Sequence, residues 1–190
     1  MKCITLALCA FFIVGCYTVK AQTEAEMKNW MEYMTPGDVH KMIASWNGIW
    51  DGEVTTWMTP GGDPVSNTAS TTNTMVMGGR YQSSTYTGSF SGMPFEGMSL
   101  LGYDNARKLF ELAWIDNMGT GIMHLQGPWD PAAKTITLTG KMIDPSTGKE
   151  TIMKEVFKII DSDHHEMEMY GPGPDGKEFV TMQIKLTRKK

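Results

Sequence analysis

The sequence predicts an all-β protein: a roughly ten-stranded antiparallel up-and-down β-barrel, preceded by two short N-terminal helices. From Trp46 onward, short runs rich in Thr, Val, Ile, Met and aromatic residues alternate with a period of two. Turn signals such as "TPGGDP", "MGGR", "DPSTGK" and "GPGPDG" separate about ten such runs. No helical pattern lies between the runs, so the connections are hairpins. A meander of this length closes into a barrel, with a two-sheet sandwich as the alternative.

Residues 1–21 have the pattern of an export signal, so we do not expect them to be part of the folded domain. Lys2 is followed by an apolar run that is too short to span a membrane. "VKA" before Gln22 fits ordinary signal peptidase, which would leave a soluble periplasmic or secreted protein. "IVGC" resembles a bacterial lipobox, and cleavage there would leave a membrane-anchored lipoprotein with its lipid on Cys16.

The composition limits the classes of function. The chain has 190 residues, of which 41% are hydrophobic, enough for one domain with a sizeable core. A net charge of −4, with no basic run inside the fold, argues against nucleic-acid binding. Cys3, Cys9 and Cys16 all precede Gln22, so a soluble exported form has no disulfide and no cysteine nucleophile. Membrane contact is expected only through a lipid on Cys16.

Residues 22–45 are expected to form the two helices. "TEAEMKNWMEYM" opens with a capping box, Thr23 and Glu26, and carries one apolar stripe. "TPGDVHKMIASW" restarts the helical spacing, with Thr35 as the expected cap. The barrel domain then occupies residues 46–190.

One residue pair is expected to close the barrel. By parity, Trp50 lies on the inward face of the first strand, and Arg188 continues the apolar face of the last strand, "EFVTMQIKLTR". First and last strands are neighbours in a closed meander, so the guanidinium can stack on the indole and donate to nearby carbonyls. The pair is therefore interpreted as structural.

Two resemblances support this architecture. "GIW" with a final-strand arginine resembles the G-x-W feature of the lipocalin and fatty-acid-binding (calycin) barrels, where the pair closes one end beneath a short helix. The set "GIWDGEV", "GGRY", "GMPFEGMSLLGYDNARK", "WIDNMGTGIM", "DPSTGK" and "PDGKEF" resembles a bacterial family of exported proteins, domain of unknown function 1579. This second resemblance covers most of residues 36–188. It implies a lipocalin-like fold, and it implies no activity and no catalytic residue.

The segment "FELAWIDNMGTG" supplies the main candidates for a binding site. Its alternate residues share an apolar face that is expected to point inward, and an acid on such a face needs a hydrogen-bond partner. Asp116 is either a cap for the following turn, which is the favoured interpretation, or a contact for a polar ligand group. The candidate ligand-binding residues are Phe110, Trp114, Asp116, Met118, Tyr103 and Arg80.

Metal and haem binding are weaker alternatives. His165, Met167 and Met169 share one strand face and form a soft ligand set suited to Cu(I). Same-face neighbours on a strand lie about 6.5 to 7 Å apart and form a row, so core packing is the favoured interpretation. His124 is a lone strand histidine, and ten-stranded haem barrels of the nitrobindin type use one inward histidine as the axial ligand.

The leading hypothesis is a non-enzymatic carrier or sensor that binds a small apolar or amphipathic molecule in the barrel interior. The main alternative is an enzyme with an acid/base carboxylate inside the barrel, Asp116 being the first suspect. The others are haem or Cu(I) binding and a filled barrel that acts as an interaction protein. An interior open to solvent would separate the first two classes from the filled barrel, and a strongly raised carboxyl pKa would favour an enzyme.

Overall fold

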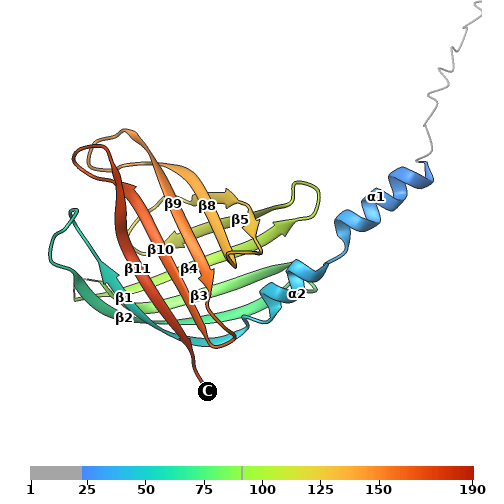
Figure 1. The fold of residues 1–190 in the computed structure, drawn as a ribbon, viewed down its shortest axis with the longest axis horizontal. Coiled ribbons are helices and arrows are strands. Elements are labelled where there is room, and N and C mark those ends of the chain that lie inside the picture. Colours follow the sequence, from blue (N-terminus) through green and yellow to red (C-terminus); the bar gives the residue numbers. More distant parts are fainter. Residues whose placement is uncertain (1–22, 91) are drawn as a thin grey trace, which may run out of the picture.

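The computed structural model describes residues 23–90 and 92–190, and the expected export signal of residues 1–21 lies outside them. Two helices precede the strands (Figure 1). The helices are α1 (Glu24–Met34) and α2 (Asp38–Ala44). The strands are β1 (Gly48–Thr56), β2 (Val65–Val76), β3 (Tyr81–Phe90), β4 (Met93–Asp104), β5 (Leu109–Asp116), β6 (Met123–Gly127), β7 (Trp129–Asp130), β8 (Thr135–Ile143), β9 (Glu150–Ile159), β10 (His164–Pro172) and β11 (Glu178–Arg188).

The strands form one antiparallel sheet that closes on itself. Neighbours follow chain order from β1 to β6, and on the other side β1 pairs with β11, which leads back through β10 and β9 to β8. A further pairing of β6 with β8 closes the ring, and β7 is a two-residue addition at that seam. The ten-stranded antiparallel barrel predicted from the sequence is thereby confirmed.

Two glycines permit the closure between β6 and β8, where the register contains the single pair Gln126 and Thr139. A Cβ atom added at Gly127 would lie 1.8 Å from the carbonyl oxygen of Thr137. One added at Gly140 would lie 2.0 Å from the carbonyl oxygen of His124. Any side chain at either position would push the two backbones apart, so the barrel closes here because neither residue has one.

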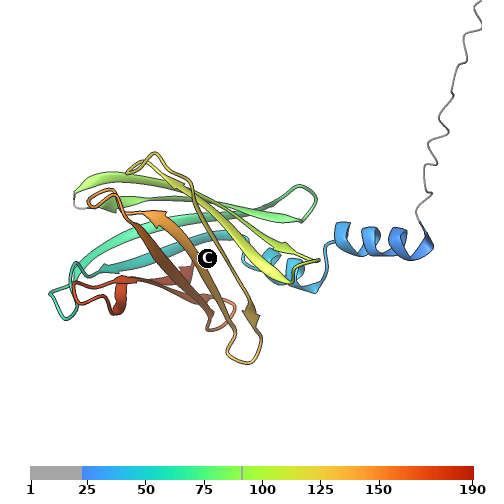
Figure 2. The ribbon, with the colours of Figure 1, turned by 90° about the horizontal axis from the view of Figure 1, so that it is seen from above.

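The helices differ in how they meet the barrel. α2 covers one end, where Ile43 is fully buried, whereas α1 has no buried residue and extends away from the strands in both views (Figures 1 and 2). The barrel holds only the C-terminal end of α1. Arg80 donates from Nη2 to the carbonyl of Met34 at 2.7 Å, and Asn105 donates to the carbonyl of Thr35 at 2.8 Å. The apolar stripe of α1 is therefore exposed.

The helix caps follow the sequence in part. The capping box of Thr23 and Glu26 is present at the start of α1. The expectation for Thr35 was wrong, because this residue ends α1, its hydroxyl donating to the carbonyl of Met31 at 2.6 Å. Gly37 is the N-cap of α2, and its N–H donates to Nδ1 of His40. An extended link between the helices explains the shift, since the residue before a proline avoids helical dihedral angles.

Candidate functional site

The barrel interior divides into two halves that differ in solvent exposure. The half beneath α2, called the closed half, contains side chains that are at most 4% exposed, namely Ile43, Trp46, Trp50, Phe110, Leu125, Ile136 and Leu138. The other half, called the open half, is lined by inward-facing side chains that remain only half-buried. By register with Trp50 and by their burial, these are Val54, Thr56, Tyr86, Trp114, Met153, Glu155, Met167, Met169, Met182 and Ile184.

The structure brings Trp50 and Arg188 together in the closed half. They are direct partners in the β1–β11 register, and the guanidinium carbon lies 4.3 Å from the indole centroid. Arg188 also donates to the carbonyls of Asn47 at 2.6 Å and Ser45 at 2.7 Å, which follow α2 directly. The guanidinium thus fastens the last strand to the segment between α2 and β1. Its nitrogen atoms all donate to backbone carbonyls at this end of the barrel.

His165 is enclosed on the same side of the barrel. Its ring is 4% exposed, stacks on Trp50 at a centroid distance of 4.3 Å, and meets Phe157 edge-on at 5.1 Å. Burial, with a smaller contribution from the charge of Arg188, lowers the pKa of His165 to about 4. The imidazole is therefore neutral near pH 7 and serves as a packing group between aromatic rings.

The residues suggested for metal and haem binding do not form a shared site. Met167 and Met169 point inward with His165 along β10, but they lie beside the open half, whereas the His165 ring is covered by aromatic side chains. Within residues 23–90 and 92–190 no group of three or more His, Cys, Asp or Glu side chains is placed to hold a metal ion. His124 is exposed and alternates with the buried Leu125, so it lies on the outer face of β6. The expectation of an inward histidine at this position is corrected.

Asp116 has partners for both carboxylate oxygens. Oδ2 accepts a hydrogen bond from Nε1 of Trp114 at 2.7 Å. Oδ1 accepts from the backbone N–H groups of Met118 at 2.9 Å and Gly119 at 3.1 Å. Asp116 therefore caps the turn after β5 and also fixes the orientation of the Trp114 indole, so both of its oxygens are already bonded although the residue faces inward by register.

The other candidates from the sequence lie in different places. Phe110 is 0% exposed in the closed half, so it offers no surface to a ligand, and Tyr103 packs edge-on against it at 5.1 Å. Met118 lies 47% exposed in the turn after β5. Arg80 is on the outside, bonded to the end of α1. Of the six candidates only Trp114 is left to contact a ligand in the open half. Strand parity predicts the face of a residue and not its depth along the barrel, which explains Phe110 and Tyr103, and it does not apply to Arg80 and Met118, which lie in turns.

Two open-half residues, Glu155 and Tyr86, were missed by the sequence argument. Glu155 lies on the inward face of β9, opposite Leu138 on β8 and Met169 on β10. Within the described residues its carboxylate has no hydrogen-bond or ion-pair partner. The signal was available, since Met153, Glu155 and Phe157 share one parity. The opposite face carries Val156 between lysines, which blurs the alternation and hides the inward acid.

The environment shifts the pKa values of both groups. Burial in the barrel raises the pKa of the Glu155 carboxyl to about 7. Burial also raises the pKa of the Tyr86 hydroxyl, the charge of Glu155 raises it further, and hydrogen bonds to Ser99 and Ser84 oppose the shift. The hydroxyl of Tyr86 lies 3.3 Å from that of Ser99, and its ring meets Trp114 edge-on at 4.9 Å. The charge of Glu155 on β9 thus acts on the hydroxyl of Tyr86 on β3, and both side chains face the interior by register.

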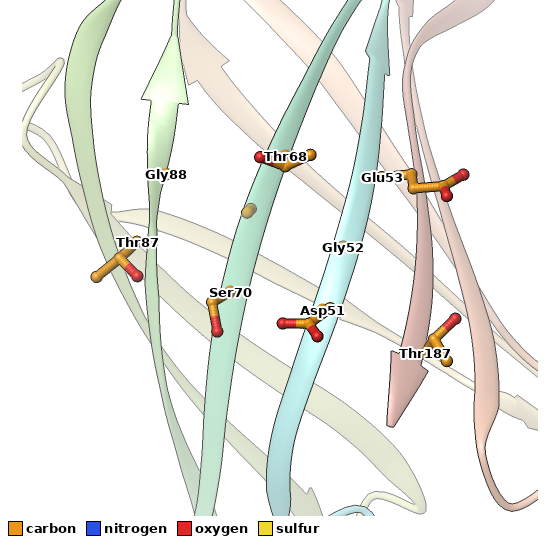
Figure 3. A pocket seen from close by; sticks show the side chains of 9 residues that line it. Asp51, Gly52, Glu53, Thr68, Ser70, Thr87, Gly88 and Thr187 are labelled. Atoms are coloured by element: carbon orange, nitrogen blue, oxygen red, sulfur yellow. The ribbon is translucent and has the colours of Figure 1, made fainter. Parts of the chain in front are cut away.

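A depression on the outer surface has a structural explanation. It is lined by residues of β1, β2, β3 and β11, including Asp51, Glu53 and Ser70 (Figure 3). By register, these three side chains point to the face opposite that of Trp50. Gly52 and Ala69 are register partners beneath it, and Gly88 continues the row on β3. Three small residues side by side let the sheet bend here, which hollows its outer face. Glu155 is not among the residues that line the depression.

Comparisons with known proteins show the family and the fold. The sequence model of the family described as "Protein of unknown function (DUF1579)" matches residues 35–188. A solved structure, "Crystal Structure of Rv2717c from M. tuberculosis", superposes with a TM-score of 0.61 at 15% identity and covers 82% of this chain and 100% of that chain. This likeness concerns the fold alone. A comparison with curated proteins gives no match. No helix among the described residues has the length and apolar character needed to cross a membrane.

Proposed function

Because the chain belongs to the family described as "Protein of unknown function (DUF1579)", we propose its function from its own geometry: the barrel is a carrier or sensor that binds a small amphipathic molecule in its open half. The observation that carries the proposal is the exposure of inward-facing side chains. Met167, Met169 and Met182 point into the barrel and still keep solvent-accessible surface. Flexible methionines and aromatic rings around a few polar groups are typical of pockets for apolar molecules.

Burial of an apolar ligand here would be favourable. Each Å² of apolar surface removed from water contributes about 25 cal/mol, so a ligand that buries a few hundred Å² can reach micromolar affinity after ordering costs. The closed half cannot take part, because its side chains already fill it. The ligand would enter between the loops at the end opposite α2, and its apolar part would lie among the methionines.

A fluorescence titration with a hydrophobic dye tests this proposal. Val54 faces the interior and Thr55 faces outward on the same strand, so Val54→Phe and Thr55→Phe form a matched pair. Val54→Phe should weaken dye binding several-fold by occupying the open half, and Thr55→Phe should leave it unchanged. If Val54→Phe and Thr55→Phe bind the dye equally well and Trp30→Ser does not bind it, the dye lies on the exposed stripe of α1 and the proposal is overturned. The absence of binding below about 100 μM would also overturn it.

Catalysis is a second candidate, favoured by one observation. A carboxyl with a pKa of about 7 inside a barrel can act as a general acid or base near neutral pH. The residue is Glu155, and not Asp116, whose oxygens are both bonded. Incubation of a metabolite extract with the wild type and with Glu155→Gln separates the classes. A product formed only by the wild type indicates an enzyme, whereas a molecule retained unchanged indicates a carrier.

We also propose that the protein is exported, on the pattern of residues 1–21 alone. The first residue of the protein isolated from its native host tests this. Gln22, or a lipid-modified Cys16, is the expected start, and an intact Met1 would contradict export.

A further inference from the structure

We propose that Glu155 and Tyr86 form the polar end of the ligand site and that the ligand is an amphiphile with a primary or secondary amine as its head group. This inference rests on the proposed interior binding site and specifies its ligand. The Glu155 carboxylate lies among apolar register neighbours, Leu138 and Met169, and has no hydrogen-bond or ion-pair partner in the part of the chain that the structure describes. An unpaired carboxylate among apolar side chains is costly even when it is half-buried, and such a group is characteristic of functional sites.

The sign of charge in the interior favours a cation. Among the described residues, three charged side chains face inward by register: Asp116, Glu155 and Arg188. Arg188 is committed to backbone carbonyls at the closed end, and both oxygens of Asp116 are engaged. Of these three charged side chains, Glu155 is the one whose charge is not engaged by another group of the described residues. An anionic head group, such as that of a fatty acid, would therefore meet a like charge and find no cation to pair with.

The hydrogen-bonding capacity of the site favours an amine with N–H groups. A carboxylate only accepts hydrogen bonds, and a protonated amine supplies two or three N–H donors. Tyr86 can accept one of these through its hydroxyl while it donates to Ser99, whose oxygen lies 3.3 Å away. The rings of Tyr86 and Trp114, in edge-on contact, offer aromatic faces that also attract a cation. An alkyl chain attached to the amine would extend among Met153, Met169 and Met182.

Calorimetric titration of the full chain with three probes of equal chain length tests the inference. The probes are dodecylamine, dodecanol and dodecanoate, each used below its micelle-forming concentration. The wild type should bind the amine about tenfold or more tightly than the other two. Glu155→Gln should lose this preference, so that the amine binds as the alcohol does, while the affinity for dodecanol stays within about twofold.

Glu166→Gln is the matched control, because it removes the same charge from the outer face of β10, where Gln183 donates to Glu166 at 2.7 Å. This variant should keep the preference for the amine. Equal binding of the three probes by the wild type, or a preference for dodecanoate, would overturn the amine assignment and leave the proposed interior site standing. If none of the probes binds, the proposed function itself fails. Circular dichroism and thermal unfolding show whether each variant is folded.

The pH dependence gives a second readout. Among the described residues, Tyr86 on β3 is a titratable group on the interior face on which the charge of Glu155 acts, and the register partners of Glu155 on β8 and β10, Leu138 and Met169, do not titrate. Amine binding needs the ionised carboxylate, whose pKa in the free protein is about 7. The amine affinity should therefore rise about tenfold or more from pH 5 to pH 8 in the wild type and stay flat in Glu155→Gln. A flat profile in the wild type would contradict the proposal.

Discussion

The closed and open halves of this barrel are built from the same strands, yet their charged and titratable side chains differ in how they are bonded. In the closed half, Arg188 stacks on Trp50 and donates to carbonyls, and His165 is neutral between aromatic rings. In the open half, the Glu155 carboxylate has no hydrogen-bond or ion-pair partner among residues 23–90 and 92–190, and the Tyr86 hydroxyl bonds to serine hydroxyls. The difference indicates that the closed half supplies stability, whereas the open half retains an unsatisfied group at a cost in stability.

Truncation of a tryptophan in each half should give the largest contrast. Trp50→Ala should lower the free energy of unfolding by about 3 to 5 kcal/mol, because the indole is 1% exposed and its loss leaves a cavity. Trp114→Ala should cost only about 1 to 2 kcal/mol, because its site is partly open to solvent and loses less packing. Urea denaturation of both variants measures the difference. Equal losses would mean that the open half contributes to the core as much as the closed half.

Removal of the guanidinium should have the next largest effect. Arg188→Ala should cost about 1 to 3 kcal/mol, because it strands the carbonyls of Ser45 and Asn47 and uncovers Trp50. Arg107→Ala, which breaks an exposed ion pair with Glu111, should cost less than about 1 kcal/mol and is the control. A double-mutant cycle of Arg188→Ala with Trp50→Phe should be non-additive. Strict additivity would show that the stacking contact is energetically silent.

The two halves should respond to pH with opposite signs. The folded-state pKa of His165 is depressed to about 4, so its contribution to stability is present above about pH 6.5 and is lost as the pH falls. The folded-state pKa of Glu155 is raised to about 7 from 4.5, so its contribution is present at low pH and is lost as the pH rises toward 7.

Substitutions should separate these two contributions. Glu155→Gln should make the protein more stable than the wild type at pH 8, by about 1 to 2 kcal/mol once interior water is allowed for, and should change little at pH 4.5. His165→Gln should flatten the loss of stability between pH 6.5 and 4. Urea unfolding across this range, with Glu166→Gln as the control, measures both effects. A Glu155→Gln variant that is less stable at pH 8 would contradict the assigned environment of the carboxyl.

The smallest effect is expected at the turns around the open half. Asp116→Ala should cost about 1 kcal/mol, because it removes a turn cap and also the partner of the Trp114 indole. Asp175→Ala is a matched change, since Asp175 accepts from the backbone N–H of Lys177 and has no indole partner. It should cost about 0.5 kcal/mol. If the two variants lose the same stability, the hydrogen bond from Trp114 contributes nothing measurable.

The sequence predicted the fold because the information for it is local. Period-two alternation and hairpin turns fix each strand and its inward face, and a meander with short connections leaves few topologies open. Strand parity predicts that Trp50 and Arg188 are neighbours, because the first and last strands of a closed meander pair with each other. The site was harder to predict, because parity says which face a residue occupies and says nothing of its depth. Phe110 and Trp114 share a parity, but one lies in the closed half and the other lines the open half.

By itself, the sequence determined the strand pattern and the inward faces, and it also predicts an export signal. Only the tertiary structure decided that inward-facing side chains are buried in the half beneath α2 and half-buried in the other, and that the charge of Glu155 on β9 acts on the hydroxyl of Tyr86 on β3. These residues are far apart in the chain, and the distance between them depends on the tilt of the strands and on the register at which β6 pairs with β8. A pKa of about 7 follows from that enclosure, because desolvation depends on every atom around the carboxyl and not on its neighbours in sequence.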